Sequence, residues 1–146
     1  MNILMINGAN LNLLDKRDSD IYSNLSIEEI RELMQKEFPE FSITSYQSNI
    51  EGEIVQAIQK ADEKFDGMII NPGGYAHTSV AIMDALELCK IPKIEVHLSH
   101  LAKREEYRQT LLTAKNTDGY ISGFKENSYL ACDVSVKKDS GKVVLS

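Results

Sequence analysis

The chain has 146 residues, of which 42% are hydrophobic, and its formal net charge is −6. This composition fits one compact domain with a real core and excludes the disordered and fibrous classes. The negative charge argues against a nucleic-acid surface, because phosphate backbones require a dense basic face. The sequence has no apolar run of the roughly 18 residues that span a membrane and no signal peptide at its N-terminus. We therefore expect a cytoplasmic protein with neither nucleic-acid nor membrane partners.

The two cysteines, Cys89 and Cys132, are far apart in the sequence and have apolar neighbours. A disulfide framework needs more cysteines than this, and no metal-binding spacing surrounds them. We expect buried free thiols in a reducing compartment.

Short apolar runs alternate with amphipathic stretches along the whole chain. Strands are predicted at 2–6, 41–47, 68–70, 93–98 and 119–123. Helices are predicted at 26–38, where Ser26 and Glu29 form a capping box, at 50–65 and from about 79 to 90. A short polar helix is expected at 101–109 and a further helix at 126–138. The tail after Lys138 is expected to pair weakly or fray, and Val143 to Leu145 fit more than one structure.

Alternating short apolar strands and helices predict a parallel sheet that helices cover on both faces. Five strands in this length fit a flavodoxin-like, doubly wound α/β sheet, with residues 1–146 forming a single domain. No repeat, linker or low-complexity tract interrupts the pattern.

The connection from 7 to 22 is the first sign of function. Tight strand-to-helix loops need about 2 to 6 residues, and this one is much longer and contains Asn10, Arg17 and Tyr22. A long polar loop after a buried strand is unsuited to packing. We expect a mobile functional segment, with a closing lid at about 14–23.

Ligands of open α/β sheets bind beyond the carboxyl ends of the strands. This rule brings together residues 7–22, 71–79 and 95–100, which contribute amides, histidines, an arginine and tyrosines, and Arg108 could point back toward them. Glu95 and His97 would share one face of a regular strand, so Glu95 can orient His97 as an acid–base imidazole. Metal-binding spacing, GxGxxG, GxxxxGK[ST] and GxSxG are all absent from the sequence.

Each of these residues also has a purely structural interpretation. Tyr22 could anchor a loop, a histidine at a strand end could be a hydrogen-bonded structural residue, and Asn71 could cap the turn before Pro72. Gly73 and Gly74 could hold an anion or merely make the turn. Arg104, Glu105 and Glu106 resemble a solvated helix face. The convergence of so many polar groups at one edge favours function.

Three motifs now indicate a family. NGANLNLL followed by KR and IY, NPGGYAHTSVA-x-x-DAL, and IEVHLS with REEYR resemble the type II 3-dehydroquinate dehydratases. The resemblance implies a flavodoxin-like lyase without cofactor or metal, assembled as a dodecamer, a tetramer of trimers. It also implies anti elimination of water from 3-dehydroquinate through an enolate, giving 3-dehydroshikimate. The reaction would serve the shikimate pathway to chorismate and aromatic amino acids, or quinate catabolism.

The resemblance assigns roles to individual residues. Tyr22 is the implied base, Arg17 keeps it ionised, and Asn10 holds a water near the enolate. His97 is the implied general acid, oriented by Glu95. The positions implied to bind substrate are Asn71, His77, Leu98, Ser99, Arg108 and, from a neighbouring subunit, Asp84.

The tyrosine base requires help from charge. A free tyrosine titrates near pH ~10, so making phenolate dominant at neutral pH requires about 4 kcal/mol of stabilisation. One cation typically supplies about 1 to 3 of the roughly three pKa units required. Arg17 alone is therefore marginal, and Arg108 could supply the remainder.

The lid departs from the family pattern. Ala9 replaces a usual proline, Asp15 and Ser23 replace glycines, and Asp18-Ser19 replaces Glu-Pro. Losing prolines increases the entropy of the open loop, and the added aspartates repel an anionic substrate. We expect a more mobile lid and weaker substrate binding than in a typical member.

Two other classes were weighed. A flavin- or nucleotide-binding module fits the sheet but lacks a phosphate loop. A receiver-like or purely interacting domain requires an acidic cluster after the first strand, where this chain has Asn7-Gly8-Ala9-Asn10. Both alternatives leave Tyr22, His77 and His97 unexplained.

Overall fold

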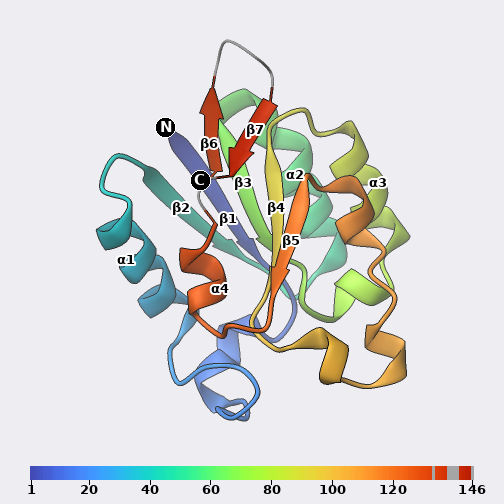
Figure 1. Ribbon diagram of the computed structural model, residues 1–146. Coiled ribbons are helices and arrows are strands. Elements are labelled where there is room, and N and C mark those ends of the chain that lie inside the picture. Colours follow the sequence, from blue (N-terminus) through green and yellow to red (C-terminus); the bar gives the residue numbers. More distant parts are fainter. Residues whose placement is uncertain (133, 138–141, 146) are drawn as a thin grey trace.

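The computed structural model describes residues 1–132, 134–137 and 142–145. Five parallel strands form its central sheet in the order β2-β1-β3-β4-β5 (Figure 1). The strands are β1 Asn2–Asn7, β2 Ser42–Gln47, β3 Gly67–Asn71, β4 Lys93–His97 and β5 Gly119–Ser122. This is the flavodoxin-like order, so the predicted fold class is confirmed.

Helices cover both faces of the sheet (Figure 1). α1 (Ile27–Glu37) and α4 (Asn127–Leu130) pack with one core cluster, and α2 (Glu51–Lys64) and α3 (Val80–Leu88) pack with the other. The side chains of β1 alternate between the two clusters: Ile3 and Met5 belong to the first, Leu4 and Ile6 to the second. This period of two explains why the strands read as continuous apolar runs.

The predicted capping box opens α1. Ser26 Oγ accepts a hydrogen bond from Glu29 N at 3.1 Å, and Glu29 Oε1 accepts one from Ser26 N at 3.4 Å. Ser79 caps α3 in a similar way, because its Oγ accepts from Ile82 N at 2.9 Å. Both helix starts therefore follow from local sequence.

Two glycines let the ends of β1 and β3 meet. A Cβ at Gly8 would overlap the carbonyl oxygen of Pro72. Gly73 has φ +64°, in the left-handed region, and its Cβ would lie 2.9 Å from Ala9 O. The glycines of the NGAN and NPGG motifs are thus required by this close approach of two loops.

The predicted helix at 101–109 is wrong. The chain forms two short 3₁₀ turns, η3 (Leu101–Lys103) and η4 (Glu106–Arg108), with extended backbone at Arg104 and Glu105 between them. A continuous helix needs an apolar stripe to bury, whereas Leu101 is the only buried residue of these two turns.

The predicted helix at 126–138 is also wrong beyond its first turn. α4 ends at Leu130, and β6 (Val134–Lys137) pairs antiparallel with β7 (Lys142–Leu145). The alternation Val-Ser-Val-Lys has the period of a strand, and β-branched residues favour it. The expected fraying after Lys138 falls partly on 138–141 and 146, which lie outside the described residues, and partly on β7, which is paired.

The cysteines are buried free thiols, as predicted. Burial raises the pKa of Cys89 to about 11 and that of Cys132 to about 12, so both remain protonated thiols at neutral pH. Among the described residues, no helix has the length and apolar character to cross a bilayer.

Candidate active site

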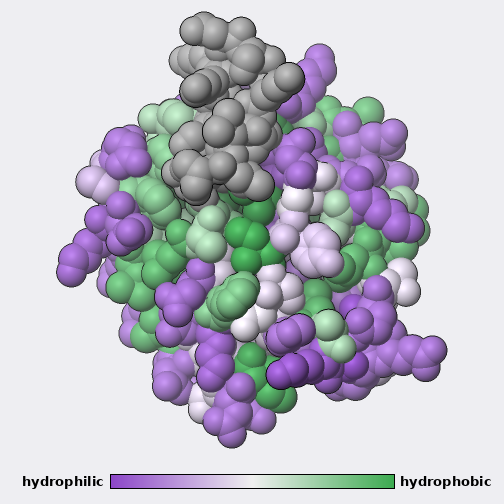
Figure 2. Space-filling view, in the orientation of Figure 1, coloured by the Kyte–Doolittle hydropathy of each residue, from purple (hydrophilic) through white to green (hydrophobic). Residues whose placement is uncertain are grey.

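The polar segments gather at the carboxyl ends of β1, β3 and β4, at the lower end of Figure 1. Hydrophilic residues dominate this rim of the surface (Figure 2). A cavity of about 30 Å³ lies between the segments. Its lining consists of Leu11, Arg17, Tyr22, Asn71, His77, His97, Leu98, Ser99, Leu101, Arg104 and Arg108. Most of the site residues expected from the sequence therefore do meet.

The lid contributes an arginine and a tyrosine in direct contact. Leu11 and Leu14 of η1 (Leu11–Lys16) are buried in the core and anchor the start of the lid. Arg17 Nη2 donates a hydrogen bond to the Tyr22 hydroxyl, and the guanidinium carbon lies 3.7 Å from the centre of the tyrosine ring. Tyr22 is only 9% exposed, so this cation acts on a shielded phenol.

A second arginine near Tyr22 was missed. Arg104 was interpreted as part of a solvated face, but its guanidinium lies 5.3 Å from the centre of the Tyr22 ring. Its Nη1 donates to Ser99 Oγ at 3.0 Å, which turns the side chain inward. Arg108, expected to help ionise Tyr22, also lines the cavity, and both arginines pair with Glu105 Oε2, Arg104 at 3.2 Å and Arg108 at 3.0 Å. Arg104 points inward because the backbone is extended between η3 and η4, and no sequence pattern predicts that break.

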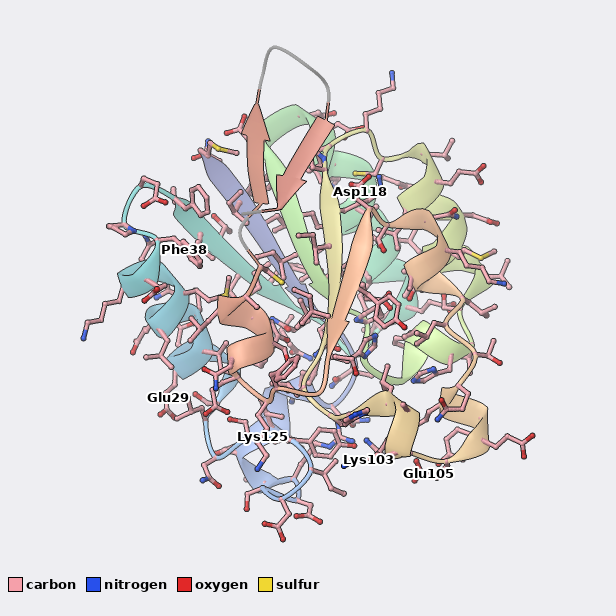
Figure 3. The ribbon with its side chains drawn as sticks, in the orientation of Figure 1. Glu29, Phe38, Lys103, Glu105, Asp118 and Lys125 are labelled. Carbon is pink, nitrogen blue, oxygen red and sulfur yellow. The ribbon has the colours of Figure 1, made fainter. Side chains whose placement is uncertain are left out.

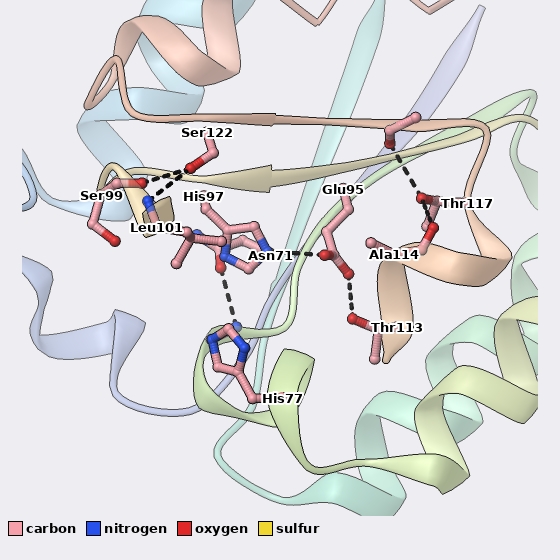
Figure 4. Close-up of polar contacts among 12 residues, drawn as sticks. Asn71, His77, Glu95, His97, Ser99, Leu101, Thr113, Ala114, Thr117 and Ser122 are labelled. Atoms are coloured by element: carbon pink, nitrogen blue, oxygen red, sulfur yellow. Dashed lines mark hydrogen bonds and ion pairs between the residues drawn. The ribbon is translucent and has the colours of Figure 1, made fainter. Parts of the chain in front are cut away.

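His97 belongs to a buried hydrogen-bonded chain (Figure 4). Its Nε2 donates to Glu95 Oε2 at 2.9 Å, so the prediction that the two residues share a face is confirmed. The other oxygen, Glu95 Oε1, accepts a hydrogen bond from Thr113 Oγ1 in η5 (Thr113–Asn116). Glu95 and Thr113 are both fully buried. No sequence motif surrounds Thr113, so sequence reasoning has no signal by which to select it.

His77 faces His97 across the cavity, with ring centres 6.1 Å apart. Its Nδ1 lies 2.8 Å from Thr110 O, and a carbonyl only accepts, so Nδ1 carries the proton. Burial lowers the pKa of His77 below its usual value. The imidazole is therefore neutral at neutral pH and keeps Nε2 as an acceptor.

Asn71 is held at both ends of its carboxamide. Its Oδ1 accepts from Gly73 N at 3.0 Å, and its Nδ2 donates to the Tyr129 hydroxyl at 3.0 Å. Because the Gly73 N–H is used within the turn, that group is not free to hold an anion. The glycine pair makes a turn.

Three expected site residues lie outside the cavity lining formed by the described residues. Glu95 lies behind His97. Asn10 stands at the start of η1 with φ 70°, and its backbone N–H donates to Asn49 Oδ1 at 2.9 Å. Asp84 lies on α3.

The segment after β5 fastens the lid from outside (Figure 3). Lys125 Nζ donates to the carbonyl of Ser19 at 2.9 Å, and Ser23 Oγ donates to Glu126 Oε2 at 2.8 Å. Ser23, where the family usually has glycine, thus adds a hydrogen bond that glycine cannot make. This contact opposes the expected increase in lid mobility, which stays a prediction.

The fold is an open α/β sheet, and tyrosine, histidine and arginine side chains share one cavity at the carboxyl ends of its strands. The sequence model of the dehydroquinase class II family matches residues 1–136. The 3-dehydroquinate dehydratase of Clostridium botulinum is 46% identical over 131 residues, covering 88% of this chain and 89% of that protein. The enzyme of the same name from Thermotoga petrophila is 44% identical over 140 residues, covering 94% and 96%. The chain belongs to the class II dehydroquinase family.

A solved structure agrees with this assignment. The type II dehydroquinase of Butyrivibrio crossotus superposes with a TM-score of 0.85 at 41% identity, covering 89% of this chain and 92% of that one. In the part of the chain that the structure describes, no three His, Cys, Asp or Glu side chains are grouped to hold a metal ion.

Proposed function

We propose that this class II dehydroquinase, a hydro-lyase acting on 3-dehydroquinate, eliminates water through an enolate with Tyr22 as the base and His97 as the general acid. The observation that carries this proposal is the shared cavity. Arg17 and Tyr22 border it from the lid and His97 borders it from the sheet, where Glu95 holds His97 from behind. Anti elimination needs proton removal and proton delivery from different sides of the substrate.

Tyr22 removes the proton next to the ketone. Its hydroxyl already accepts a hydrogen bond from Arg17, a cation that favours the phenolate form. Arg104 adds a second guanidinium 5.3 Å from the centre of the ring, and this group also pairs with Glu105 at 3.2 Å. Both guanidinium groups therefore lie close to the ring of one shielded tyrosine.

His97 protonates the departing hydroxyl. Its Nε2 is engaged with Glu95, which leaves Nδ1 for the substrate, and the carboxylate stabilises the imidazolium before the proton is given up. Thr113 supplies a donor to the other oxygen of Glu95. The carboxylate is therefore held in one orientation and paired on both oxygens despite full burial.

The remaining polar groups bind substrate and stabilise the enolate. We assign hydroxyl and carboxylate recognition to Asn71, His77, Ser99, Arg108 and the backbone of Leu98. Asn10 holds a water at the enolate oxygen, where donors gain most from the developing charge. The neutral His77, with Nε2 as acceptor, suits a substrate hydroxyl that donates.

Substrate entry requires the lid to open. A cavity of about 30 Å³ has room for only one or two waters. The substrate has a six-membered carbon ring with a carboxylate, so it is too large for this cavity. Arg17 and Tyr22 must move away and return, so the base is completed by lid closure, which also excludes water.

We also propose a homo-oligomer, a dodecamer built from trimers, in which Asp84 reaches the site of a neighbouring subunit. The position of Asp84 outside its own cavity lining is compatible with that role. Apolar side chains around the edge strand β5 support association, since Tyr120 is 55% exposed and Phe124 65%. Size measurement by sedimentation tests the assembly. We assign the reaction to the shikimate pathway, or to quinate catabolism, and the protein to the cytoplasm.

The deciding assay follows the near-ultraviolet absorbance of the conjugated enone formed from 3-dehydroquinate. We expect turnover by the wild type and a loss of at least about 10³-fold in kcat for Tyr22→Phe, because phenylalanine cannot accept a proton. Tyr46→Phe, on β2 and absent from the cavity lining, is the matched control. An inactive wild type would contradict the function, and an active Tyr22→Phe would contradict the base.

A further inference from the structure

Tyr129 lies in a buried hydrogen-bonded chain that joins three distant parts of the fold. The Asn71 Nδ2 donates to the Tyr129 hydroxyl at 3.0 Å, and that hydroxyl donates to Asn7 Oδ1 at 2.6 Å. Asn7 ends β1, Asn71 ends β3, and Tyr129 lies on α4. The exposed fractions are 0% for Asn7 and Tyr129 and 3% for Asn71.

The backbone fixes the direction of this chain. The Gly73 N–H can only donate, so the atom of Asn71 that faces it at 3.0 Å must be Oδ1. Asn71 therefore presents Nδ2 to Tyr129, whose oxygen accepts. The single hydroxyl proton of Tyr129 is then left for Asn7 Oδ1. The Gly73 N–H thus determines the orientation of the Asn71 carboxamide, which in turn makes the Tyr129 oxygen an acceptor.

The consequence reaches the cavity. Nδ2 of Asn71 carries two protons, and Tyr129 takes one of them. Asn71 lines the cavity, so the second N–H is the donor it can offer to an oxygen there. Without Tyr129, Gly73 alone would hold the carboxamide, and the Nδ2 end could swing.

We infer that Tyr129 is a positioning residue that fixes the Asn71 carboxamide as a donor toward a substrate oxygen. The inference rests on the proposed function, in which Asn71 binds substrate. Tyr129 itself does not line the cavity among the described residues, so it acts only through Asn71. Its full burial, which raises the pKa of the phenol well above its usual value, keeps the hydroxyl protonated and the chain polarity constant.

The kinetic test is Tyr129→Phe, which removes only the hydroxyl. A neutral hydrogen bond contributes about 1 kcal/mol, so we expect KM for 3-dehydroquinate to rise about fivefold while kcat changes less than about twofold. In an Asn71→Ala background, the same change should raise KM less than about twofold, because nothing remains to position. An unchanged KM for Tyr129→Phe would overturn the inference. So would a double variant whose rise in KM equals the product of the rises in the two single variants.

Ser128→Ala is the matched control on the same helix. Ser128 is also fully buried, and its Oγ accepts from Phe124 N at 2.9 Å, away from Asn71. Both substitutions should lower the unfolding midpoint, but only Tyr129→Phe should raise KM. Equal rises in KM for Tyr129→Phe and Ser128→Ala would mean that Tyr129 acts only through the stability of the fold, which would contradict the positioning role.

A measurement without turnover separates this inference from the proposed function. In the ¹⁵N-labelled wild type, the side-chain amide protons of Asn71 should exchange with solvent more slowly than those of Asn127, an exposed residue of α4. In Tyr129→Phe they should exchange about tenfold faster. Wild-type Asn71 protons exchanging at the rate of a free amide would overturn the positioning role, even if Tyr129→Phe failed to fold. An inactive enzyme with protected Asn71 protons would instead count against the function alone.

Discussion

The proposed acid side and the proposed base side of the site are built in opposite ways. His97 and Glu95 on β4 and Thr113 on η5 are buried and hold one another by hydrogen bonds. Tyr22 and Arg17 belong to the lid. Two hydrogen bonds hold the lid at its rim, one from Lys125 to Ser19 and one from Ser23 to Glu126. The acid is therefore preorganised, whereas the base is assembled when the lid closes. A site that must admit its substrate can fix one side permanently and has to leave the other movable.

The largest effect should follow from removing the lid cation. Arg17→Met keeps the length of the side chain but removes the charge that favours phenolate, so we expect kcat to fall about 100-fold. Arg104→Met should cost less, about tenfold, because its charge lies farther from the ring. Steady-state kinetics from pH 6 to 10 checks both, and equal losses would contradict the assignment of Arg17 as the main cation.

The acid side should respond to Thr113→Val, which swaps a hydroxyl for a methyl group of similar size. Hydrogen bonds to charged groups contribute about 1.5 to 3 kcal/mol, so we expect kcat to fall at least about tenfold. Thr113→Ser, which keeps the donor to Glu95, should recover most of the rate. A valine variant as active as the serine variant would show that the Glu95 carboxylate needs no partner besides His97.

The lid fastening predicts a smaller effect. Ser23→Gly restores the residue usual in the family and removes the hydrogen bond to Glu126. We expect KM to rise about threefold through easier opening of the lid, together with faster proteolysis between Leu14 and Ser23. Glu126→Gln still accepts from the serine and should stay near wild type. A lower KM for the glycine variant would mean that the fastening hinders entry more than it aids closure.

The smallest effect concerns stability and pH. Burial lowers the pKa of His77 from its usual value near 6.5. Just below that pH, His77 therefore binds a proton in the unfolded chain but stays neutral in the folded chain. The stability that neutral His77 contributes is complete above about pH 6.5 and declines as the pH falls below it. Between pH 7.5 and 5.5, the unfolding midpoint of the wild type should drop by more than that of His77→Gln. Equal drops would indicate that His77 gains its proton freely in the folded protein.

Much of the fold could be predicted because it depends on local pattern. The apolar runs determined β1, β3 and β4, the Ser26–Glu29 pair determined the start of α1, and alternation along β4 placed Glu95 beside His97. The helix prediction is wrong at 101–109, where the sequence has no apolar stripe to bury. It is also wrong after α4, where the residues alternate with the period of a strand.

What the sequence determined by itself is the sheet, the strand ends that collect the polar groups, and the long lid with its arginine and tyrosine. These properties depend on residues near one another in the chain. Only the tertiary structure decided that Arg104 turns toward Tyr22, that Thr113 completes Glu95, and that Tyr129 joins Asn71 to Asn7. The last pairs are 58 and 122 positions apart in the chain. Contacts at such separations depend on how helices and sheet pack, and a local pattern carries no information about that packing.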